Sequence, residues 1–181
     1  MNVIKTEIEG VVIIEPKVFG DARGFFLETF NIAQFTDAGL PTEWLQDNWS
    51  RSKKGVLRGL HFQQPNPQGK LVRVMQGSVW DVAVDIRPGS PTFGRHVAVE
   101  LNSENKRAFY VPPGLAHGFL VTSDVCDFTY KCTQLYAPKF ESGVLWNDPD
   151  LGIQWPLSDV ALSEKDKKLP RLKDLSQSLP L

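Results

Sequence analysis

The chain has 181 residues, of which 41% are hydrophobic and 23% are charged, values typical of a single soluble globular domain. Twenty basic residues against 21 acidic ones give a formal charge of −1, which argues against sequence-independent binding of nucleic acid through the whole surface. No apolar run approaches the roughly 20 residues that a membrane-spanning helix needs, and the opening MNVIKTEIEG does not have the pattern of a signal peptide.

Short β-strands separated by turn residues are predicted along most of the chain. The first is a compact apolar run over 10–14, and alternating stretches follow at 56–63, 70–75, 78–86, 96–101, 107–111, 118–122 and 127–136. Segments rich in Gly, Pro and Asn, such as QPNPQG, RPGSPTFG and NSEN, separate these stretches as turns do. Many short strands favour a sandwich or jelly-roll barrel, whereas a TIM barrel or Rossmann fold would need repeated helices between them.

Helical signals are confined to two places. One short helix is predicted over 32–38, with Asn31 as its N-cap and Gly39 at its end. After residue 156 the chain is less hydrophobic and ends SEKDKKLPRLKDLSQSLPL, which predicts a short solvated helix and a loose tail. We therefore expect one domain over 1–181, with a polar C-terminal segment from about residue 157.

The two cysteines are not expected to form a disulfide with each other. On one extended strand, Cys126 and Cys132 would lie about 20 Å apart at ~3.3 Å per residue. A disulfide tolerates roughly 7 Å between Cα atoms. Two thiols without a disulfide framework suit a reducing cytoplasm, where we expect the protein to be located.

The three histidines are the first candidates for chemistry. His61 and His117 each stand in a strand that contains glycine, where small neighbours allow a ligand to approach closely. A hydrogen-bonded structural role is the alternative for both, and it is the role expected of His96. A metal-dependent barrel enzyme often has two histidines one residue apart on a strand, but Gln63 stands two residues after His61. Metal-free chemistry is favoured, although His61, His117 and a distant carboxylate could still form a facial triad.

Two further patterns concern the direction of side chains. Arg58 and His61 are three residues apart, so a regular strand would point them to opposite faces unless a bulge at Gly59 intervenes. Tyr130 and Tyr136 have the same strand parity and could face one cavity, where a phenol can donate a proton. The alternative for both tyrosines is an aromatic stripe in the core.

Several basic residues stand in or beside strands and turns rather than in the charged tail. Each is solvated by default, but several converging on a cleft would suit a phosphate or diphosphate, to which arginine offers a bidentate fork. These residues are Arg23, Arg58, Lys70 and Arg73.

Ordered segments from about residue 10 to residue 166 carry a resemblance to a known family. They are FGDARGFFLETF, QDNWSRSKKGVLRGLHFQ, QGKLVRV, GSVWDVAVDIRPGSPTFG, LNSENKR, VPPGLAHGF, YKCTQLYAP, WNDPDLGIQWP and LSEKD. With these segments the chain resembles the dTDP-4-dehydrorhamnose 3,5-epimerases, isomerases of dTDP-L-rhamnose synthesis. The resemblance implies an all-β, cupin-type jelly-roll barrel with a few short helices, assembled as a homodimer that needs no metal or other cofactor. It also implies a nucleotide-sugar substrate, and neither nucleic acid nor a membrane as a partner.

The resemblance assigns roles to individual residues. His61 is similar to the family's proton acceptor, and Asp166 to the carboxylate that pairs with it. Tyr130 looks like the proton donor, and Lys70 matches the lysine near the keto oxygen of the sugar. Tyr136 matches the aromatic residue that stacks on thymine. Further positions that bind substrate are matched by Arg23, Glu28, Gln46, Asp47, Asn48, Arg58, His117, Glu141 and Lys165.

The implied reaction converts dTDP-4-dehydro-6-deoxy-α-D-glucose to dTDP-4-dehydro-β-L-rhamnose by epimerisation at C3 and C5. The C4 ketone acidifies the hydrogens on both carbons because either carbanion delocalises onto oxygen as an enolate, so one base and one acid can invert both centres in turn. The family commonly has histidine after QDN, where this chain has Trp49. The alternatives are therefore a mono-epimerase of a related dTDP-4-keto-deoxysugar, a metal-dependent cupin enzyme and a non-catalytic sugar-binding jelly roll.

Overall fold

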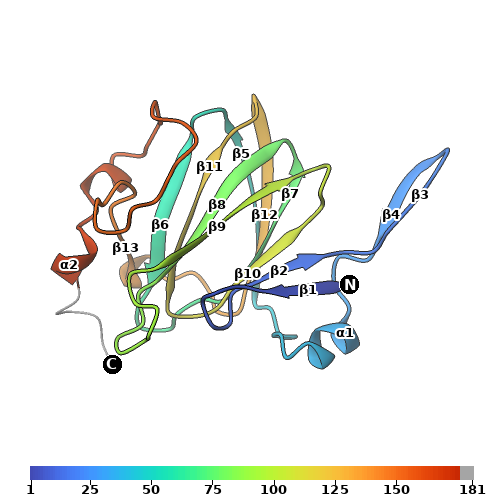
Figure 1. The fold of residues 1–181 in the computed structure, drawn as a ribbon, viewed down its shortest axis with the longest axis horizontal. Helices are drawn as coiled ribbons and strands as arrows, with labels where there is room; N and C mark the ends of the chain where they lie inside the picture. Colours follow the sequence, from blue (N-terminus) through green and yellow to red (C-terminus); the bar gives the residue numbers. More distant parts are fainter. Residues whose placement is uncertain (176–181) are drawn as a thin grey trace.

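The computed structural model describes residues 1–175 as two antiparallel sheets that face each other, with a separate hairpin (Figure 1). The first sheet has six strands in the order β1 (Asn2–Lys5), β2 (Val12–Glu15), β10 (Ala108–Val111), β7 (Lys70–Gln76), β12 (Val125–Cys132) and β5 (Gln46–Lys53). The second has five, in the order β13 (Glu141–Gly143), β6 (Leu57–Gln63), β11 (Leu115–Val121), β8 (Ser78–Asp85) and β9 (His96–Asn102). The hairpin consists of β3 (Val18–Asp21) and β4 (Gly24–Leu27). The predicted all-β class is confirmed, but within the described residues the two sheets are not joined into one continuous barrel.

Helices are few and short, as predicted. Helix α1 (Ile32–Asp37) begins after Asn31, whose side-chain oxygen accepts a hydrogen bond from the backbone N–H of Gln34 at 3.2 Å. Helix α2 (Leu172–Leu175) and the 3-10 helices Pro138–Phe140 and Asp166–Lys168 complete the set in the described part. No helix within residues 1–175 is long and apolar enough to cross a membrane. The predicted loose tail includes 176–181, which lie outside the described residues.

The strand predicted over 127–136 is shorter than expected. Strand β12 ends at Cys132. The next residue, Thr133, is joined to Gly69 by two hydrogen bonds, one from its backbone N–H at 3.0 Å and one from the Gly69 N–H to its hydroxyl at 2.8 Å. Tyr136 therefore lies in a loop, and the prediction that placed it on the strand with Tyr130 was wrong.

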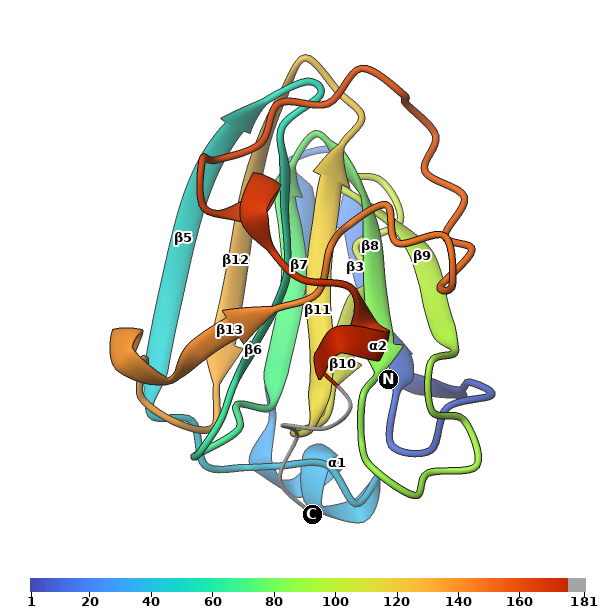
Figure 2. The same cartoon turned by 90° about the vertical axis from the view of Figure 1, so that its left-hand side faces the viewer.

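Apolar side chains from both sheets fill one part of the space between them. They come mainly from β7, β8, β11 and β12, and include Val72, Val74, Val79, Phe119, Val121 and Phe128. The outer face of the five-stranded sheet is also buried, because the segment after β13 crosses it (Figure 2). Trp80, Val82 and Val84 on β8 pack against this segment, so the alternation predicted over 78–86 is confirmed.

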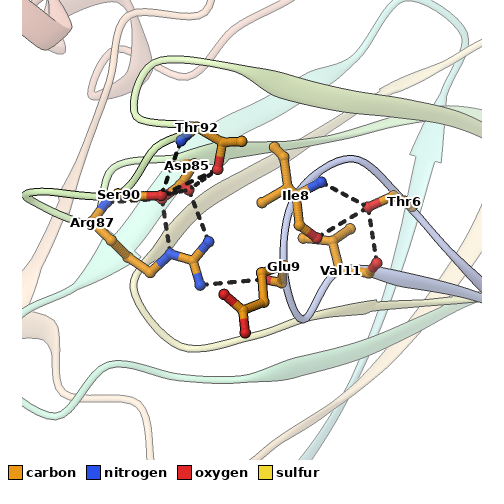
Figure 3. Close-up of polar contacts among 8 residues, drawn as sticks. All are labelled: Thr6, Ile8, Glu9, Val11, Asp85, Arg87, Ser90 and Thr92. Atoms are coloured by element: carbon orange, nitrogen blue, oxygen red, sulfur yellow. Dashed lines mark hydrogen bonds and ion pairs between the residues drawn. The ribbon is translucent and has the colours of Figure 1, made fainter.

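The end of β8 is held by a buried carboxylate, Asp85 (Figure 3). Arg87 donates to both of its oxygens, at 2.9 and 2.8 Å, and the hydroxyls of Ser90 and Thr92 each donate to Oδ2 at 2.6 Å. Burial alone would raise the pKa of the Asp85 carboxyl, but these hydrogen bonds hold it well below its usual value. Arg87 also donates to the carbonyl of Glu9, which ties this loop to the turn between β1 and β2.

Candidate active site

A cavity of about 460 Å³ opens between the inner faces of the two sheets. Side chains from β6, β7, β11 and β12 line it, together with the C-terminal segment over 161–166. Seven of the predicted site residues lie around this one cavity: Arg58, His61, Lys70, His117, Tyr130, Lys165 and Asp166. Imidazole, phenol, ammonium and guanidinium groups therefore share one space, which contains proton donors, proton acceptors and positive charge.

A bulge in β6 brings Arg58 and His61 to the same cavity. His61 is paired with His117 on the neighbouring strand β11, and Arg58 is paired with Phe119. Three residue steps on β6 therefore correspond to two on β11, so β6 contains one extra residue. Gly59 lies between these two pairs with φ +131°, and a Cβ at its position would lie 2.5 Å from Cα of Gly118. The bulge that both side chains need in order to reach one site is therefore present, and only glycine fits where the two strands approach so closely.

His61 is paired with a carboxylate from the C-terminal segment. Its Nε2 lies 2.7 Å from Oδ1 of Asp166, whose side chain is only 4% exposed. The backbone brings the two together, because Ala161 forms backbone hydrogen bonds with Gly55 and Leu57 at the start of β6. Asp166 follows five residues later, at the beginning of a 3-10 helix.

The charge on Asp166 determines which ring nitrogen of His61 carries the hydrogen. Burial alone would raise the pKa of the Asp166 carboxyl, but hydrogen bonds from His61 and from the backbone of Gly59 lower it below its usual value. A carboxylate only accepts hydrogen bonds, so Nε2 of His61 carries the hydrogen in the neutral ring. Nδ1 then has the free lone pair and is the atom able to accept a proton.

A second histidine–aspartate pair lies beside the first. Nε2 of His117 lies 2.8 Å from Oδ1 of Asp81, a fully buried residue on β8. The other oxygen, Oδ2, is buried without a hydrogen-bond partner within residues 1–175. Asp81 was not among the site residues predicted from the sequence. A carboxylate in the middle of an otherwise apolar strand could have indicated it, because a buried charge needs a partner.

Tyr130 and Lys70 are two side chains in the cavity that carry donor hydrogens, a phenol and an ammonium. Burial raises the pKa of the Tyr130 phenol, so this group remains protonated at neutral pH. Burial lowers the pKa of the Lys70 ammonium, an effect opposed by the negative charges of Glu141 and Asp81. Within the described part of the chain, the Lys70 ammonium has no hydrogen-bond or ion-pair partner, so it is free to meet a bound oxygen.

A second, smaller hollow of about 310 Å³ also has Tyr130 in its wall, so the two hollows meet at that residue. The predicted residues that line it are Gln46, Asn48, Tyr136 and Glu141. Tyr130 and Tyr136 thus face one hollow as predicted, although Tyr136 reaches it from a loop. The remaining lining residues are Gln68 and Cys132.

Glu141 connects the two hollows. It accepts a hydrogen bond from the hydroxyl of Tyr136 at 2.5 Å and pairs with the ammonium of Lys165. Its Oε1 lies 4.0 Å from Nδ1 of His61. Burial would raise the pKa of the Glu141 carboxyl, but the Lys165 and Tyr136 hydrogen bonds lower it, so Glu141 is ionised.

Two predicted binding residues lie on or next to the hairpin, away from the cavity. Arg23 lies in the turn between β3 and β4, with its side chain 90% exposed and paired with Asp21. Glu28 is exposed and accepts a hydrogen bond from Gln34 on α1 at 2.7 Å. Figure 1 shows the hairpin projecting away from both sheets, so neither residue lines the cavity of its own chain.

Three other residues lie on the outer face of the six-stranded sheet. On β5 the side chains alternate, so Asp47 points outward and pairs with Lys131 at 2.9 Å, while Gln46 and Asn48 point inward. Trp49 also points outward and is 71% exposed, so it does not line the cavity. Arg73 donates to the backbone carbonyl of Thr29, and burial lowers the pKa of its guanidinium to about 10.

Within residues 1–175, no group of three or more His, Cys, Asp or Glu side chains is placed to hold a metal ion. The Nε2 atoms of His61 and His117 are each bonded to an aspartate. His96 lies on β9 at the edge of its sheet, outside the cavity.

The cavity also has an apolar wall that was not predicted from the sequence. It is formed by Phe119 and Phe128, whose rings stack with centroids 4.0 Å apart.

Comparisons with known proteins agree with this geometry. A family model described as dTDP-4-dehydrorhamnose 3,5-epimerase matches residues 5–174. A protein of that name from Methanothermobacter thermautotrophicus is 53% identical over 174 residues, which cover 94% of each chain. The crystal structure of an epimerase from Legionella pneumophila, in complex with dTDP-4-keto-L-rhamnose, is 52% identical with a TM-score of 0.95, covering 99% of this chain and 97% of that one. A 3'-monoepimerase from Streptomyces bikiniensis, in complex with dTDP-quinovose, is 37% identical with a TM-score of 0.92, covering 97% of this chain and 90% of that one.

Proposed function

Because this chain belongs to the dTDP-4-dehydrorhamnose 3,5-epimerase family, we propose that its cavity performs the family's reaction with a histidine base and a tyrosine acid. The chain is an isomerase that inverts C3 and C5 of a dTDP-4-keto-6-deoxy sugar. The observation that carries the proposed mechanism is the His61–Asp166 pair, which shares one cavity with Tyr130.

The base in this mechanism is Nδ1 of His61. It removes the hydrogen from the carbon next to the C4 carbonyl, and the electron pair moves onto the carbonyl oxygen as an enolate. The imidazolium that forms is stabilised by the carboxylate of Asp166, which also holds the ring in the reactive tautomer. The same base then serves the carbon on the other side of the ketone.

Two groups complete the proton transfer. Tyr130 delivers its phenolic proton to the opposite face of the enolate carbon, which inverts that centre. Before the second inversion, the His61 imidazolium releases its proton to water and the Tyr130 phenolate takes one up from water. Lys70 stabilises the enolate oxygen, whose negative charge develops only as the reaction proceeds. The absence of a competing partner for its ammonium in the described chain supports this role.

The remaining cavity residues bind the nucleotide. We assign the diphosphate and sugar to the cationic and polar groups Arg58, His117 and Lys165. The adjoining hollow accommodates the nucleobase, with thymine stacked on Tyr136. Gln46, Asp47, Asn48 and Glu141 line or flank this hollow.

A homodimer explains the two residues that lie away from the cavity. Val18, Phe19, Phe25 and Phe26 on the hairpin are 42–68% exposed, an apolar surface larger than a solvated hairpin would normally present. We propose that a second copy covers this hairpin, and that Arg23 and Glu28 reach the cavity of that copy.

We further propose that residues 1–181 form one domain. We also place the protein in the cytoplasm, where its two buried free thiols, Cys126 and Cys132, remain reduced.

Proton NMR of dTDP-4-dehydro-6-deoxy-α-D-glucose with the protein in D₂O tests the proposal. We expect deuterium to enter both C3 and C5, and His61→Ala to abolish both exchanges. The matched control is His96→Ala, which removes an imidazole outside the cavity and should leave both exchanges intact. Exchange at C3 alone would favour the second candidate, a mono-epimerase, which the similarity to the Streptomyces bikiniensis enzyme supports. Exchange that persists in His61→Ala would refute the proposed base.

A further inference from the structure

The loop over 133–137, which carries Tyr136, has little packing to hold it. Gln134, Leu135 and Tyr136 are all exposed, and Leu135 has 61% of its surface in contact with solvent. Apolar burial therefore contributes little to the conformation of this loop. Its backbone must be held by other means if Tyr136 is to present a fixed ring.

Gln63 supplies hydrogen bonds on both sides of Tyr136. Its Oε1 accepts from the backbone N–H of Ala137 at 2.8 Å, and its Nε2 donates to the carbonyl of Leu135 at 3.2 Å. Nε2 also donates to the carbonyl of Asn66 at 2.7 Å, so both amide hydrogens are used. Gln63 is 4% exposed, and it lines neither of the two hollows assigned to the substrate.

Two other glutamines hold the same loop from different elements. Gln46, on β5, accepts a hydrogen bond from the backbone N–H of Tyr136 at 2.8 Å. Gln68, which precedes β7, donates to the carbonyl of Gln134 at 2.8 Å. Of the three glutamines, Gln63 is the buried one, so water cannot easily replace its hydrogen bonds.

We infer that Gln63 is a positioning residue for nucleotide binding. It fixes the backbone on either side of Tyr136 and so presents the ring to the nucleobase in one orientation, which lowers the entropy lost on binding. Gln63 extends from the strand that carries His61, so β6 supports both the base and the nucleobase loop. The inference rests on the proposed stacking of thymine on Tyr136.

Gln63→Met tests the inference, because methionine has a similar length and removes all three hydrogen bonds. We expect the Kd for dTDP, measured by calorimetry, to rise about tenfold, since each lost bond contributes modestly and partial replacement is possible. KM for the nucleotide sugar should rise in parallel, while kcat stays within about threefold of wild type. The matched control is Gln154→Met, because Gln154 donates only to the carbonyl of Gly152 at the surface. It should change neither quantity.

A double-mutant cycle separates positioning from a general structural effect. If Gln63 acts through Tyr136, then Gln63→Met should raise the Kd for dTDP by no more than a factor of about two in a Tyr136→Ala background. The full tenfold effect in that background would overturn the inference. So would an unchanged Kd in Gln63→Met alone, or a fall in kcat larger than the rise in Kd.

Two further results keep the test decisive. If circular dichroism shows that Gln63→Met does not fold, Gln63→Glu replaces it in the cycle, because ionised glutamate retains an acceptor for Ala137 but has no donor for Leu135 or Asn66. Its Kd should rise at least threefold, since two of the three hydrogen bonds are lost, and an unchanged Kd would overturn the inference. If Tyr136→Ala binds dTDP as tightly as wild type, the proposed stacking role fails. If Tyr136→Ala weakens binding and the Gln63 variants do not, only the positioning inference fails.

Discussion

Asp166→Asn is the most informative test of the proposed base. Asparagine has the size of aspartate, so the substitution removes the charge behind His61 with little change in packing. The Asp166 side chain is 4% exposed and its Oδ1 lies 2.7 Å from Nε2, so water has little room to take its place. If the new amide donates a hydrogen to Nε2, the ring proton must move to Nδ1, and the base loses its lone pair. If it accepts instead, no negative charge stabilises the imidazolium.

The size of the effect follows from these two losses. A hydrogen bond to a charged group contributes about 1.5–3 kcal/mol, which corresponds to roughly 10- to 150-fold in rate. The unfavourable tautomer adds a further loss, and the total should resemble the roughly 10⁴-fold loss known for the equivalent change in a serine-protease triad. We therefore expect kcat to fall by about 10² to 10⁴, with KM within about threefold, because the charge acts on the ring rather than on the nucleotide.

The assay is the rate of deuterium incorporation at C3 and C5, measured by NMR at saturating substrate in D₂O. Circular dichroism would establish that the variant is folded. A kcat within tenfold of wild type would refute the reasoning, because it would mean that Asp166 neither sets the tautomer nor stabilises the imidazolium. A large rise in KM with kcat unchanged would also refute it, since it would assign Asp166 to binding.

Four further predictions can be checked independently. Tyr130→Phe should retain base-dependent exchange of substrate hydrogen for deuterium, while formation of the epimerised product, followed by NMR, falls about 10²-fold or more; undiminished product would exclude Tyr130 as the acid. Trp49→His should leave the ratio of C3 to C5 exchange unchanged because Trp49 lies outside the cavity, and an altered ratio would show that it acts on specificity. Phe26→Asp should convert a dimer to a monomer in analytical ultracentrifugation and reduce activity; a variant that remains dimeric and fully active would remove the hairpin from the interface. Asp85→Asn should lower the free energy of unfolding by about 2–3 kcal/mol near pH 7. The pKa of Asp85 is held low in the folded state, so the ionised carboxylate stabilises the fold fully at pH values above its unfolded pKa of about 3.9. This stabilisation disappears in stronger acid. Urea titrations should therefore show the unfolding free energies of wild type and Asp85→Asn becoming equal as the pH falls below that value.

The sequence was most informative where a strand is buried and alternates regularly. Strand β8 follows its predicted alternation, and the N-cap at Asn31 is where its local pattern indicates. The alternation and the N-cap are each determined by residues close together in the chain. The spacing of Arg58 and His61 indicated only that a regular strand would not bring both to one site. The bulge at Gly59 is a property of the pairing between β6 and β11, so the sequence alone did not predict it.

Features that depend on distant residues were not predictable in this way. Strand β5 (QDNWSRSK) is polar because it is an edge strand, so its sequence has no hydrophobic alternation to detect. Had it been recognised, parity alone would have placed Trp49 opposite to Asn48 and outside the cavity. The pairing of His117 with Asp81 likewise requires the register of β8 and β11, which no local pattern provides.

The extra residue in β6 also limits how this enzyme can change over evolutionary time. Because of this extra residue, the guanidinium of Arg58 and the imidazole of His61 both point into the cavity from the same strand. Deleting any single residue between them would restore a regular ladder and rotate one of the two out of the cavity, so the more ideal strand would be the inactive one. The length of this segment is therefore under selection independently of its composition, and we expect natural variation in length to accumulate in the surrounding loops instead.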